Sequence, residues 1–368
     1  MYRVIISGGG TGGHVFPAIA IADAIMEQAP DTEILFVGAN GKIEMEKVPK
    51  AGYKIEGLNV VGFQRSLTLK NLIFPFKLMG SMFKALGIVR RFRPDVAVGV
   101  GGYASGPVLR TAGTMGVPTV LQEQNSYAGV TNRILAAKAE RICVAYDNME
   151  RFFPKDRIVF TGNPVRKGIL ENKINKGEAL KTLGLDQNKK TVLIFGGSLG
   201  ARTINEAVLA NANPLLEKFD INIIWQVGKI YYNQYKDCKI SDRSEVRILP
   251  FIEDMDVAYS AADVVVCRAG ALTISELAVL GKAAILIPSP NVAEDHQTVN
   301  AQSLADKGAA IMLKDKDASA DLYKTLEVLL SDDNKRSGLE NNIKYFSRPQ
   351  AAIQIAAEIL KVCAKVKS

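Results

Sequence analysis

Two glycine-rich turns are the segments of this chain whose residue types are best suited to binding a ligand. One turn, Gly-Gly-Gly-Thr-Gly-Gly, covers residues 8–13, and the other, Gly-Gly-Ser-Leu-Gly, covers residues 196–200. Each follows a short apolar run that predicts a strand and precedes a helical pattern. Glycines allow close approach to the backbone, and the N–H groups at a helix start attract anions. Both turns are therefore candidate sites for phosphate groups.

The first turn has the spacing of a dinucleotide-binding site, Gly8-x-Gly10-x-x-Gly13, but it lacks the second requirement of such a site. A carboxylate at the end of the second strand is needed to hold the ribose hydroxyls. Here that strand ends in Val-Gly-Ala-Asn at residues 37–40, which disfavours a nicotinamide-dependent oxidoreductase. Two interpretations of the turn stay open: a tight turn beside a structural His14, or an anion site with His14 next to it.

A third strand-to-helix turn, Arg-Ala-Gly-Ala-Leu-Thr-Ile-Ser-Glu-Leu, covers residues 268–277. Gly270 permits close backbone approach, and the hydroxyl of Thr273 or Ser275 can bind a phosphate oxygen together with N–H groups. Glu276 lies about one turn into the predicted helix, where its carboxylate could accept hydrogen bonds from two ribose hydroxyls. The alternative is a capping box formed by Thr273 and Glu276, although capping does not explain the arginine and glycine that open the segment.

Two more polar segments lie close to the ends of predicted strands. Gln-Glu-Gln-Asn at residues 122–125 follows the strand at residues 118–121, and α/β sheets bind ligands at the carboxyl ends of their strands. Glu-Asp-His-Gln-Thr-Val-Asn at residues 294–300 begins a helix after Pro-Ser-Pro. This second segment suits the binding of sugar hydroxyls, and it is equally typical of an ordinary polar helix start.

These turns can meet at one edge of a sheet only if strands and helices alternate, and the apolar pattern does alternate. A first series of short apolar runs covers residues 4–6, 33–37 and 96–100, and a second covers residues 191–195, 221–225, 246–249, 263–266 and 283–287. Nearly continuous apolar strands between helices indicate a parallel sheet covered on both faces. The sequence therefore predicts an α/β protein with Rossmann-like domains at residues 1–162 and 163–346. A helix at residues 347–368 is expected to pack back on the first domain.

The composition narrows the class of protein further. A chain of 368 residues with 48% hydrophobic and 23% charged residues has room for two folded domains and is neither disordered nor fibrous. Its four cysteines include no Cys-x-x-Cys pair, and its only histidines are His14 and His296, so we expect neither a disulfide framework nor a zinc site. The first residues predict a strand instead of a signal peptide, and no apolar run reaches the roughly 18 residues of a membrane span. We expect a protein that stays inside the cell.

The net charge of +8 has one concentrated source, because seven Lys and Arg residues occur between Glu56 and Asp95 without an acidic residue among them. Large apolar side chains are interspersed with the basic ones throughout residues 67–93. This mixture is typical of a segment that binds anionic lipid, and we expect no nucleic-acid partner. The alternative is an amphipathic helix packed on the sheet with its lysines in water. We favour the membrane interpretation because the apolar residues are too many for one buried stripe.

Six motifs resemble those of the MurG family of glycosyltransferases, in the same order and across essentially the whole chain. They are Gly-Gly-Thr-Gly-Gly-His at 9–14, Gly-Gly-Tyr at 101–103, Glu-Gln-Asn at 123–125, Gly-Asn-Pro-Val-Arg at 162–166, Gly-Gly-Ser at 196–198 and Arg-Ala-Gly-Ala-Leu-Thr-Ile-Ser-Glu at 268–276. The resemblance implies transfer of N-acetylglucosamine from UDP-N-acetylglucosamine to the C4 hydroxyl of the muramoyl sugar of undecaprenyl-diphospho-muramoyl-pentapeptide (lipid I to lipid II, in peptidoglycan biosynthesis). It also implies the GT-B architecture, in which two Rossmann-like domains enclose a cleft and the second holds most of the UDP-sugar.

The resemblance further implies which residues form the site. Carried over by motif, the binding site for UDP-N-acetylglucosamine consists of Thr11, Gly12, Gly13, Asn125, Arg166, Ser198, Ile252, Ala271, Leu272, Thr273, Ile274, Ser275, Glu276 and Gln297. Ile252 would contact the uracil through its backbone. The family pattern has two glutamines where this chain has His296 and Gln297, so His296 is left without an assigned role.

The implied reaction inverts the anomeric centre, so it needs one base and a stabilised leaving group. His14 is the first candidate for the base, because the positive end of a helix dipole disfavours the imidazolium and keeps the ring able to accept a proton. Glu123, a carboxylate at the same sheet edge, is the rival. The helix after Gly270 would stabilise the departing UDP, so no metal and no cofactor are expected. Asp254-x-Asp256 resembles a metal-binding pair, and we interpret it as helix N-cap chemistry.

The partners implied by the resemblance are UDP-N-acetylglucosamine, undecaprenyl-linked lipid I, an anionic membrane surface and other cell-wall synthesis proteins. The implied location is peripheral, on the cytoplasmic face of the plasma membrane, in the service of cell shape and cell division. A glycosyl-diacylglycerol synthase and a UDP-sugar 2-epimerase are the related alternatives, and the epimerase needs neither a second substrate nor the basic apolar segment. A non-catalytic sensor of nucleotide sugars would have little use for His14.

Overall fold

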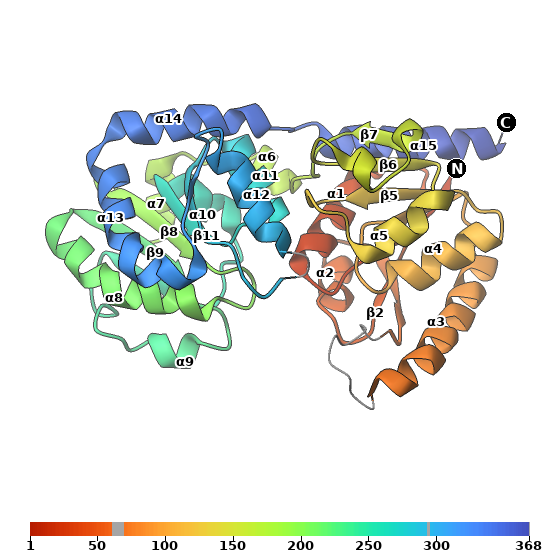
Figure 1. The fold of residues 1–368 in the computed structure, drawn as a ribbon, viewed down its shortest axis with the longest axis horizontal. Helices are drawn as coiled ribbons and strands as arrows, with labels where there is room; N and C mark the ends of the chain where they lie inside the picture. Colours follow the sequence, from red (N-terminus) through yellow and green to blue (C-terminus); the bar gives the residue numbers. More distant parts are fainter. Residues whose placement is uncertain (61–69, 293–294, 368) are drawn as a thin grey trace. The chain divides into compact units, whose positions relative to one another are not determined.

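The computed structural model describes residues 1–60, 70–292 and 295–367, the side chains of residues 70–76 excepted. Contacts within the chain divide it into two compact units, Met1–Arg166 together with Arg348–Ser368, and Lys167–Ser347. Each unit has its own parallel sheet, covered by helices (Figure 1). The predicted architecture of two Rossmann-like α/β domains is therefore confirmed.

The first unit is built on seven strands in the order β3-β2-β1-β4-β5-β6-β7. Their bounds are β1 (Arg3–Ser7), β2 (Glu33–Ala39), β3 (Lys54–Leu58), β4 (Val96–Gly99), β5 (Thr119–Glu123), β6 (Arg141–Val144) and β7 (Ile158–Phe160). β1 pairs in parallel with β2 and with β4, so that Ile5 lies opposite both Leu35 and Ala97. The strand order reverses between β1 and β4, and open α/β sheets bind ligands outside the carboxyl ends of the strands at such a reversal.

Helices cover both faces of this sheet because its strands are apolar on both sides. They are α1 (Gly12–Gln28), α2 (Glu44–Lys50), α3 (Lys70–Phe92), α4 (Ser105–Thr114), α5 (Val130–Leu135) and α15 (Ala351–Lys367), with 3-10 turns η1 (Ala136–Lys138), η2 (Met149–Arg151) and η3 (Lys155–Arg157). Ile6 packs with Ile25 of α1 in one buried cluster. Its neighbour Ile5 packs with Ile88 of α3 and Leu109 of α4 in another.

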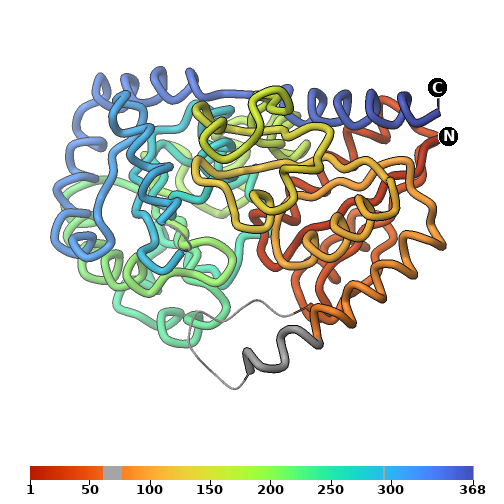
Figure 2. Tube along the Cα trace, turned by 45° about the vertical axis from the view of Figure 1, so that its right-hand side comes forward, coloured from red at the N-terminus to blue at the C-terminus, as the bar shows by residue number. Residues whose placement is uncertain are grey.

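The last helix, α15, belongs to the first unit although the chain reaches it from the second. It lies beside α1, with Ile359 buried between them, and Gln28 donates a hydrogen bond to the carbonyl oxygen of Ile353 at 2.9 Å. Its last turn lies next to the amino terminus (Figure 2), where the ammonium group of Lys367 is 3.3 Å from the carboxylate of Asp95. α15 thus completes the layer that covers one face of the first sheet.

The second unit repeats the same plan with six strands in the order β10-β9-β8-β11-β12-β13. The strands are β8 (Lys190–Phe195), β9 (Ile221–Gln226), β10 (Val246–Leu249), β11 (Val264–Cys267), β12 (Ala283–Leu286) and β13 (Ile311–Met312). The helices are α6 (Lys167–Leu170), α7 (Lys176–Thr182), α8 (Arg202–Lys218), α9 (Tyr232–Tyr235), α10 (Met255–Ala261), α11 (Ala271–Leu280), α12 (His296–Ala305), α13 (Ala318–Ser331) and α14 (Asp333–Ile343), with turns η5 (Asp315–Asp317) and η6 (Lys344–Phe346). The order reverses between β8 and β11, which places the turns after these two strands at the reversal.

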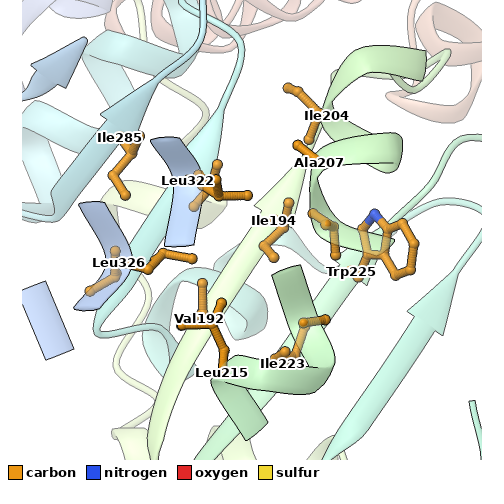
Figure 3. Packing of buried hydrophobic residues seen from close by; sticks show 14 of the residues in the cluster. Val192, Ile194, Ile204, Ala207, Leu215, Ile223, Trp225, Ile285, Leu322 and Leu326 are labelled. Carbon is orange, nitrogen blue, oxygen red and sulfur yellow. The ribbon is translucent and has the colours of Figure 1, made fainter. Parts of the chain in front are cut away.

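A continuous apolar core holds α8 and α13 against the second sheet (Figure 3). Ile194 of β8, Trp225 of β9 and Leu322 of α13 are each at most 2% exposed. The polar end of the indole is satisfied, because Trp225 Nε1 donates to the side-chain oxygen of Asn205 at 3.1 Å. This packing fixes the strands whose carboxyl ends carry the candidate site.

Helix α3 has one buried face and also carries exposed apolar side chains. Ala85, Ile88 and Val89 are buried in the core of the first unit, whereas Met79 is 50% exposed and Phe83 is 68% exposed. The sequence offered a packed amphipathic helix and a lipid-binding segment as alternatives, and the described part of α3 combines a packed face with exposed apolar side chains. Among the residues that the structure describes, no helix combines the length and apolar composition needed to span a bilayer.

Candidate functional site

In the first unit, the turns that follow β1 and β4 pack closely together beside His14. Gly101 has a φ of +90°, and a Cβ atom there would lie 2.6 Å from His14 Cδ2. Gly102 has a φ of +84°, and its Cβ would lie under 3.0 Å from the carbonyl oxygen of Gly9. Only glycine fits these two positions, so the Gly-Gly-Tyr motif serves to bring the turn after β4 against the imidazole.

The start of α1 carries Thr11, Gly12, Gly13 and His14 on partly exposed or exposed positions. Thr11 is the N-cap, in an extended conformation, and its hydroxyl lies 3.2 Å from His14 Nδ1. The N–H of His14 donates to the carbonyl oxygen of Thr11 at 3.2 Å. The first N–H groups of a helix, here those of Gly12 and Gly13, have no acceptor one turn back, so they suit an anion. This arrangement favours the interpretation of the turn as an anion site with His14 next to it.

Glu123 lies at the end of β5, is 2% exposed and accepts four hydrogen bonds. Its Oε1 accepts from the backbone N–H of Asn125 at 3.1 Å and from the Asn125 amide at 3.3 Å. Its Oε2 accepts from the N–H of Gly129 at 3.0 Å and from the amide of Asn132 at 2.9 Å. Burial raises the pKa of Glu123, and these hydrogen bonds act in the opposite direction. The carboxylate organises the loop that presents Asn125, which favours His14 over Glu123 as the base.

Arg166 and the rest of the Gly-Asn-Pro-Val-Arg motif are held near the same sheet edge. The guanidinium group of Arg166 lies over the ring of Phe16 in α1, 4.9 Å from its centre. The buried Asn163 donates to the carbonyl oxygen of Gln124 at 3.0 Å and accepts from Gln122 Nε2 at 3.1 Å. These amides tie the motif to the end of β5, a role for Gln122 and Gln124 that the sequence did not indicate.

In the second unit, the turn at residues 196–200 follows β8 and exposes Ser198. Gln226, which is 3% exposed, connects this turn to the segment after β10. Its Nε2 donates to the carbonyl oxygen of Gly197 at 2.8 Å, and its Oε1 accepts from the N–H of Ile252 at 3.0 Å. Ile252 was expected to contact uracil through its backbone; because its N–H is engaged by Gln226, its carbonyl oxygen is the group to consider for that contact.

Helix α11 begins directly after the turn that follows β11, and its N-cap is Gly270. The alternative of a capping box with Thr273 as N-cap is therefore wrong, since Thr273 lies within the first turn. Ala271, Leu272 and Ile274 are buried, Thr273 is partly exposed, and the hydroxyl of Ser275 donates to the carbonyl oxygen of Ala271 at 3.0 Å. The first-turn N–H groups of α11, like those of α1, are suited to binding a phosphate group.

Arg268 lies in the turn before α11, and Glu276 lies in the second turn of the helix. The two side chains have different surroundings. The carboxylate of Glu276 is 3% exposed and accepts a hydrogen bond from the hydroxyl of the buried Tyr259 at 3.0 Å. Arg268 donates to the carbonyl oxygens of Ile287 and Pro288, each at 3.1 Å, and also to the carboxylate of Asp315. Arg268 thus stabilises the loop after β12. The arginine at the start of this turn is therefore explained without assigning it to a ligand.

The two remaining segments lie at the starts of α12 and α10. Gln297, in the first turn of α12, accepts a hydrogen bond from the backbone N–H of Ser289 at 2.9 Å. Glu294 lies outside the described residues. Asp254 is the N-cap residue of α10, as predicted, but its side chain makes no capping hydrogen bond. Within the described part of the chain, no three His, Cys, Asp or Glu side chains are grouped so that they could hold a metal ion.

Family models match both halves of the chain. The glycosyltransferase family 28 N-terminal domain matches residues 4–144, and the glycosyltransferase family 28 C-terminal domain matches residues 191–355. Most of the candidate residues fall within these two matches; Arg166 lies between them.

Curated relatives match the chain from end to end. A UDP-N-acetylglucosamine–N-acetylmuramyl-(pentapeptide) pyrophosphoryl-undecaprenol N-acetylglucosamine transferase from Flavobacterium psychrophilum is 51% identical over 367 residues, covering 100% of this chain and 99% of the relative. A protein of the same name from Bacteroides thetaiotaomicron is 54% identical over 362 residues, covering 98% and 97% of the two chains.

Solved structures agree with this grouping. The crystal structure of Acinetobacter baumannii MurG has a TM-score of 0.74 and 30% sequence identity, and the match covers 98% of this chain and 100% of that one. A UDP complex of Staphylococcus aureus MnaA has a TM-score of 0.73 at 12% identity, covering 100% and 98%, and shares the fold alone. The resemblance inferred from the six motifs and the GT-B fold are confirmed. The chain belongs to glycosyltransferase family 28 and, within it, to the MurG family of UDP-N-acetylglucosamine–N-acetylmuramyl-(pentapeptide) pyrophosphoryl-undecaprenol N-acetylglucosamine transferases.

Proposed function

We propose that this enzyme transfers N-acetylglucosamine from UDP-N-acetylglucosamine to the C4 hydroxyl of the muramoyl sugar of undecaprenyl-diphospho-muramoyl-pentapeptide, with inversion at the anomeric carbon. The observation that carries the proposal is 51% identity over the full chain to a transferase of this name. Incubation with labelled UDP-N-acetylglucosamine and lipid I should yield labelled lipid II. Label transferred to diacylglycerol, or an epimerised UDP-sugar, would instead assign one of the two related activities.

The donor is bound mainly by the second unit. The carbonyl oxygen of Ile252 accepts from the uracil, and the carboxylate of Glu276 accepts from the ribose hydroxyls. The diphosphate lies against the first-turn N–H groups of α11 and the hydroxyl of Ser198, and Gln297 contacts the sugar. The exposure of Ser198, the position of Gly270 as N-cap and the location of these residues at the reversal of strand order support this assignment.

The first unit binds the acceptor and supplies the base. The C4 hydroxyl attacks the anomeric carbon while the bond from that carbon to the phosphate oxygen breaks, and UDP leaves with the electron pair. His14 takes the hydroxyl proton, and the positive end of α11 stabilises the charge that develops on UDP. His14 lies beside the exposed Thr11 and Gly13, which the resemblance assigns to the donor site, and this position supports its role next to the reacting carbon.

Because a helix start meets the leaving diphosphate, we expect the enzyme to keep its rate in excess EDTA. The measurement is lipid II formation after exhaustive chelation, with and without added magnesium or manganese. A rate that collapses on chelation and returns with either cation would mean that Asp254 and Asp256 bind a metal instead of beginning α10.

We propose in addition that α3 docks the first unit on the cytoplasmic face of the membrane that holds the lipid acceptor. The exposed Met79 and Phe83 lie one turn apart on one side of the helix. Lys77 and Lys84, which are two turns apart on another side, are also exposed. Apolar side chains at the surface insert between lipids, while the lysines attract anionic head groups. Phe74 and Phe76 are among the large apolar residues of the segment at residues 67–93 that favour membrane binding, and their side chains lie outside the described residues.

Replacing both Lys77 and Lys84 with Glu should reduce binding to anionic vesicles by at least about tenfold, because each reversal turns an attraction to the surface into a repulsion. Co-sedimentation with vesicles of phosphatidylglycerol is the measurement, and binding of UDP should stay as in the wild type. A matched variant with Glu at Lys155 and Lys361, both exposed and outside α3, should sediment like the wild type. Equal sedimentation of all three proteins would reduce α3 to a packed helix without a membrane role.

A further inference from the structure

A buried carboxylate, that of Glu44, holds the glycine-rich turn that precedes α1. Glu44 is the first residue of α2 and is 1% exposed. Its Oε1 accepts a hydrogen bond from the N–H of Ala39 at the end of β2, and its Oε2 accepts from the N–H of Gly10, both at 2.9 Å. One side chain thus bridges the ends of two adjacent strands at the sheet edge that carries His14.

Two glycines are required to make room for this carboxylate. A Cβ atom at Gly9, which has a φ of +146°, would lie under 3.0 Å from the carboxylate carbon and both oxygens of Glu44. A Cβ atom at Gly38 would lie 2.5 Å from Glu44 Cγ. A bound phosphate accepts hydrogen bonds from N–H groups of glycine-rich turns in nucleotide-binding proteins. In this chain the carboxylate of Glu44 accepts a hydrogen bond from an N–H of the turn instead. The glycines of the dinucleotide-like spacing are therefore explained without a bound dinucleotide.

Close contacts continue from this carboxylate to the imidazole of His14. The carboxylate of Glu44 occupies the space that a Cβ atom at Gly9 would need. Gly102 lies close to the carbonyl oxygen of the same Gly9. The next residue, Gly101, lies against the ring of His14, since a Cβ there would be 2.7 Å from Nε2. The interiors of proteins are close-packed, so a shift of the turn at Gly9 and Gly10 is transmitted to the residues that rest on it.

We propose that Glu44 is the positioning residue for His14. It touches no reacting atom; by fixing Gly10 it sets the start of α1 and the place of the imidazole. This inference rests on the proposed role of His14 as the base. It extends that role by naming the side chain that makes the geometry at the base rigid, and it is independent of Ser198, Ile252 and Glu276, the residues of the second unit that are proposed to bind UDP.

The test is Glu44→Gln, which keeps the shape of the side chain but has one acceptor oxygen and an NH₂ group that would face an N–H. We expect kcat to fall about 10- to 100-fold, the effect of misplacing a catalytic group by about 1 Å. The KM for UDP-N-acetylglucosamine should change by less than about threefold, a small effect on the scale of binding free energies. In a His14→Ala background the same substitution should cost almost nothing further, because groups that act as a unit are not additive. Equal losses in both backgrounds would overturn the proposal.

A second readout does not depend on catalysis. The chain has only two histidines, so the ring resonances of His14 and His296 can be assigned in an NMR spectrum with one substitution. Glu44→Gln should move the resonances of His14 and leave those of His296 in place. Glu46→Gln, at an exposed position of the same helix, should move neither. Unmoved His14 resonances in a folded Glu44→Gln protein would overturn the proposal.

The two readouts also separate this inference from the proposed function. If His14→Ala leaves kcat unchanged while Glu44→Gln still moves the His14 resonances, the role of His14 as base has failed and the positioning by Glu44 stands. Thermal unfolding shows whether the variant is folded. If Glu44→Gln does not fold, Glu44→Asp keeps both acceptor oxygens on a side chain shorter by one methylene group. It should then show the same pattern of a lowered kcat, a nearly constant KM and displaced His14 resonances, and a wild-type kcat with unmoved resonances would overturn the proposal.

Discussion

Replacing His14 with Ala should lower kcat by about 10²- to 10⁴-fold, the range typical of a lost general base. Binding of UDP-N-acetylglucosamine should change little, because the proposed donor residues Glu276, Ile252 and Gln297 belong to the other compact unit. Steady-state rates of lipid II formation give kcat, and calorimetry gives the dissociation constant of the donor. His296→Ala is the matched control: it removes the only other histidine, which has no assigned role, and should leave kcat close to that of the wild type.

The rival base is tested by Glu123→Gln. A glutamine has one acceptor oxygen, so it cannot accept all four hydrogen bonds that converge on the carboxylate. Leaving a buried donor unsatisfied costs about 1–3 kcal/mol, so the free energy of unfolding should fall by that amount. If Glu123 only organises its loop, the activity of the folded protein should fall less than in His14→Ala. A loss of donor affinity in His14→Ala, with kcat retained, would make His14 a binding residue and Glu123 the leading candidate for the base.

The sequence predicted the fold well where strands are buried on both faces. Apolar runs such as residues 4–6, 96–100 and 191–195 each correspond to a strand in the centre of a sheet. The strands it missed, β3, β6, β7 and β13, are short or carry polar residues. Of these, β6 is the one that has a neighbouring strand on both sides. β3 reads Lys-Ile-Glu-Gly-Leu and is largely only half-buried, and β13 has two residues. Both β3 and β13 lie at sheet edges, where one side of the strand has no neighbouring strand. Apolar residues are therefore less strictly required there than in the centre of the sheet.

Only the parts of the candidate site that depend on the spacing of neighbouring residues could be predicted from the sequence. Glycines followed by a helix identified the turns, because the chemistry of an anion-binding turn is contained in a few consecutive residues. The side chains that hold these turns were not found. Glu44 is 34 residues from Gly10, and Gln226 is 26 residues from Ile252. Their residue types are ordinary for a surface, and only the folded chain shows that both are buried.

Local pattern also left two alternatives for one helix start. Thr273 and Glu276 have the spacing of a capping box, but the helix begins at Ala271 with Gly270 as its N-cap. A glycine N-cap leaves the first-turn N–H groups without a side-chain acceptor, and the strand before it fixes where the helix can begin. Glu276 is therefore not a capping residue, and its carboxylate faces Tyr259 inside the domain.

Glu276 is the residue of the proposed donor site with the largest expected effect on binding, because its carboxylate is the charged group assigned to the ribose hydroxyls. Glu276→Ala should weaken UDP binding by about 10- to 100-fold, because a hydrogen bond to a charged group contributes about 1.5–3 kcal/mol and each 1.4 kcal/mol is tenfold. The sharper measurement compares UDP with 2′-deoxy-UDP by calorimetry. The wild type should prefer UDP, whereas Glu276→Ala should bind both with similar affinity.

Tyr259→Phe is the matched control, because it removes the hydrogen bond that Glu276 accepts within the protein and keeps the carboxylate itself. That variant should still prefer UDP over 2′-deoxy-UDP, although the loss of a buried hydrogen bond lowers its stability by about 0.5–1.5 kcal/mol. If Glu276→Ala keeps the affinity of the wild type for UDP and loses stability as Tyr259→Phe does, the carboxylate serves only to hold α10 against α11. The ribose would then have to be recognised by another group at the turn after β11, where Thr273 is the partly exposed side chain nearest to the helix start.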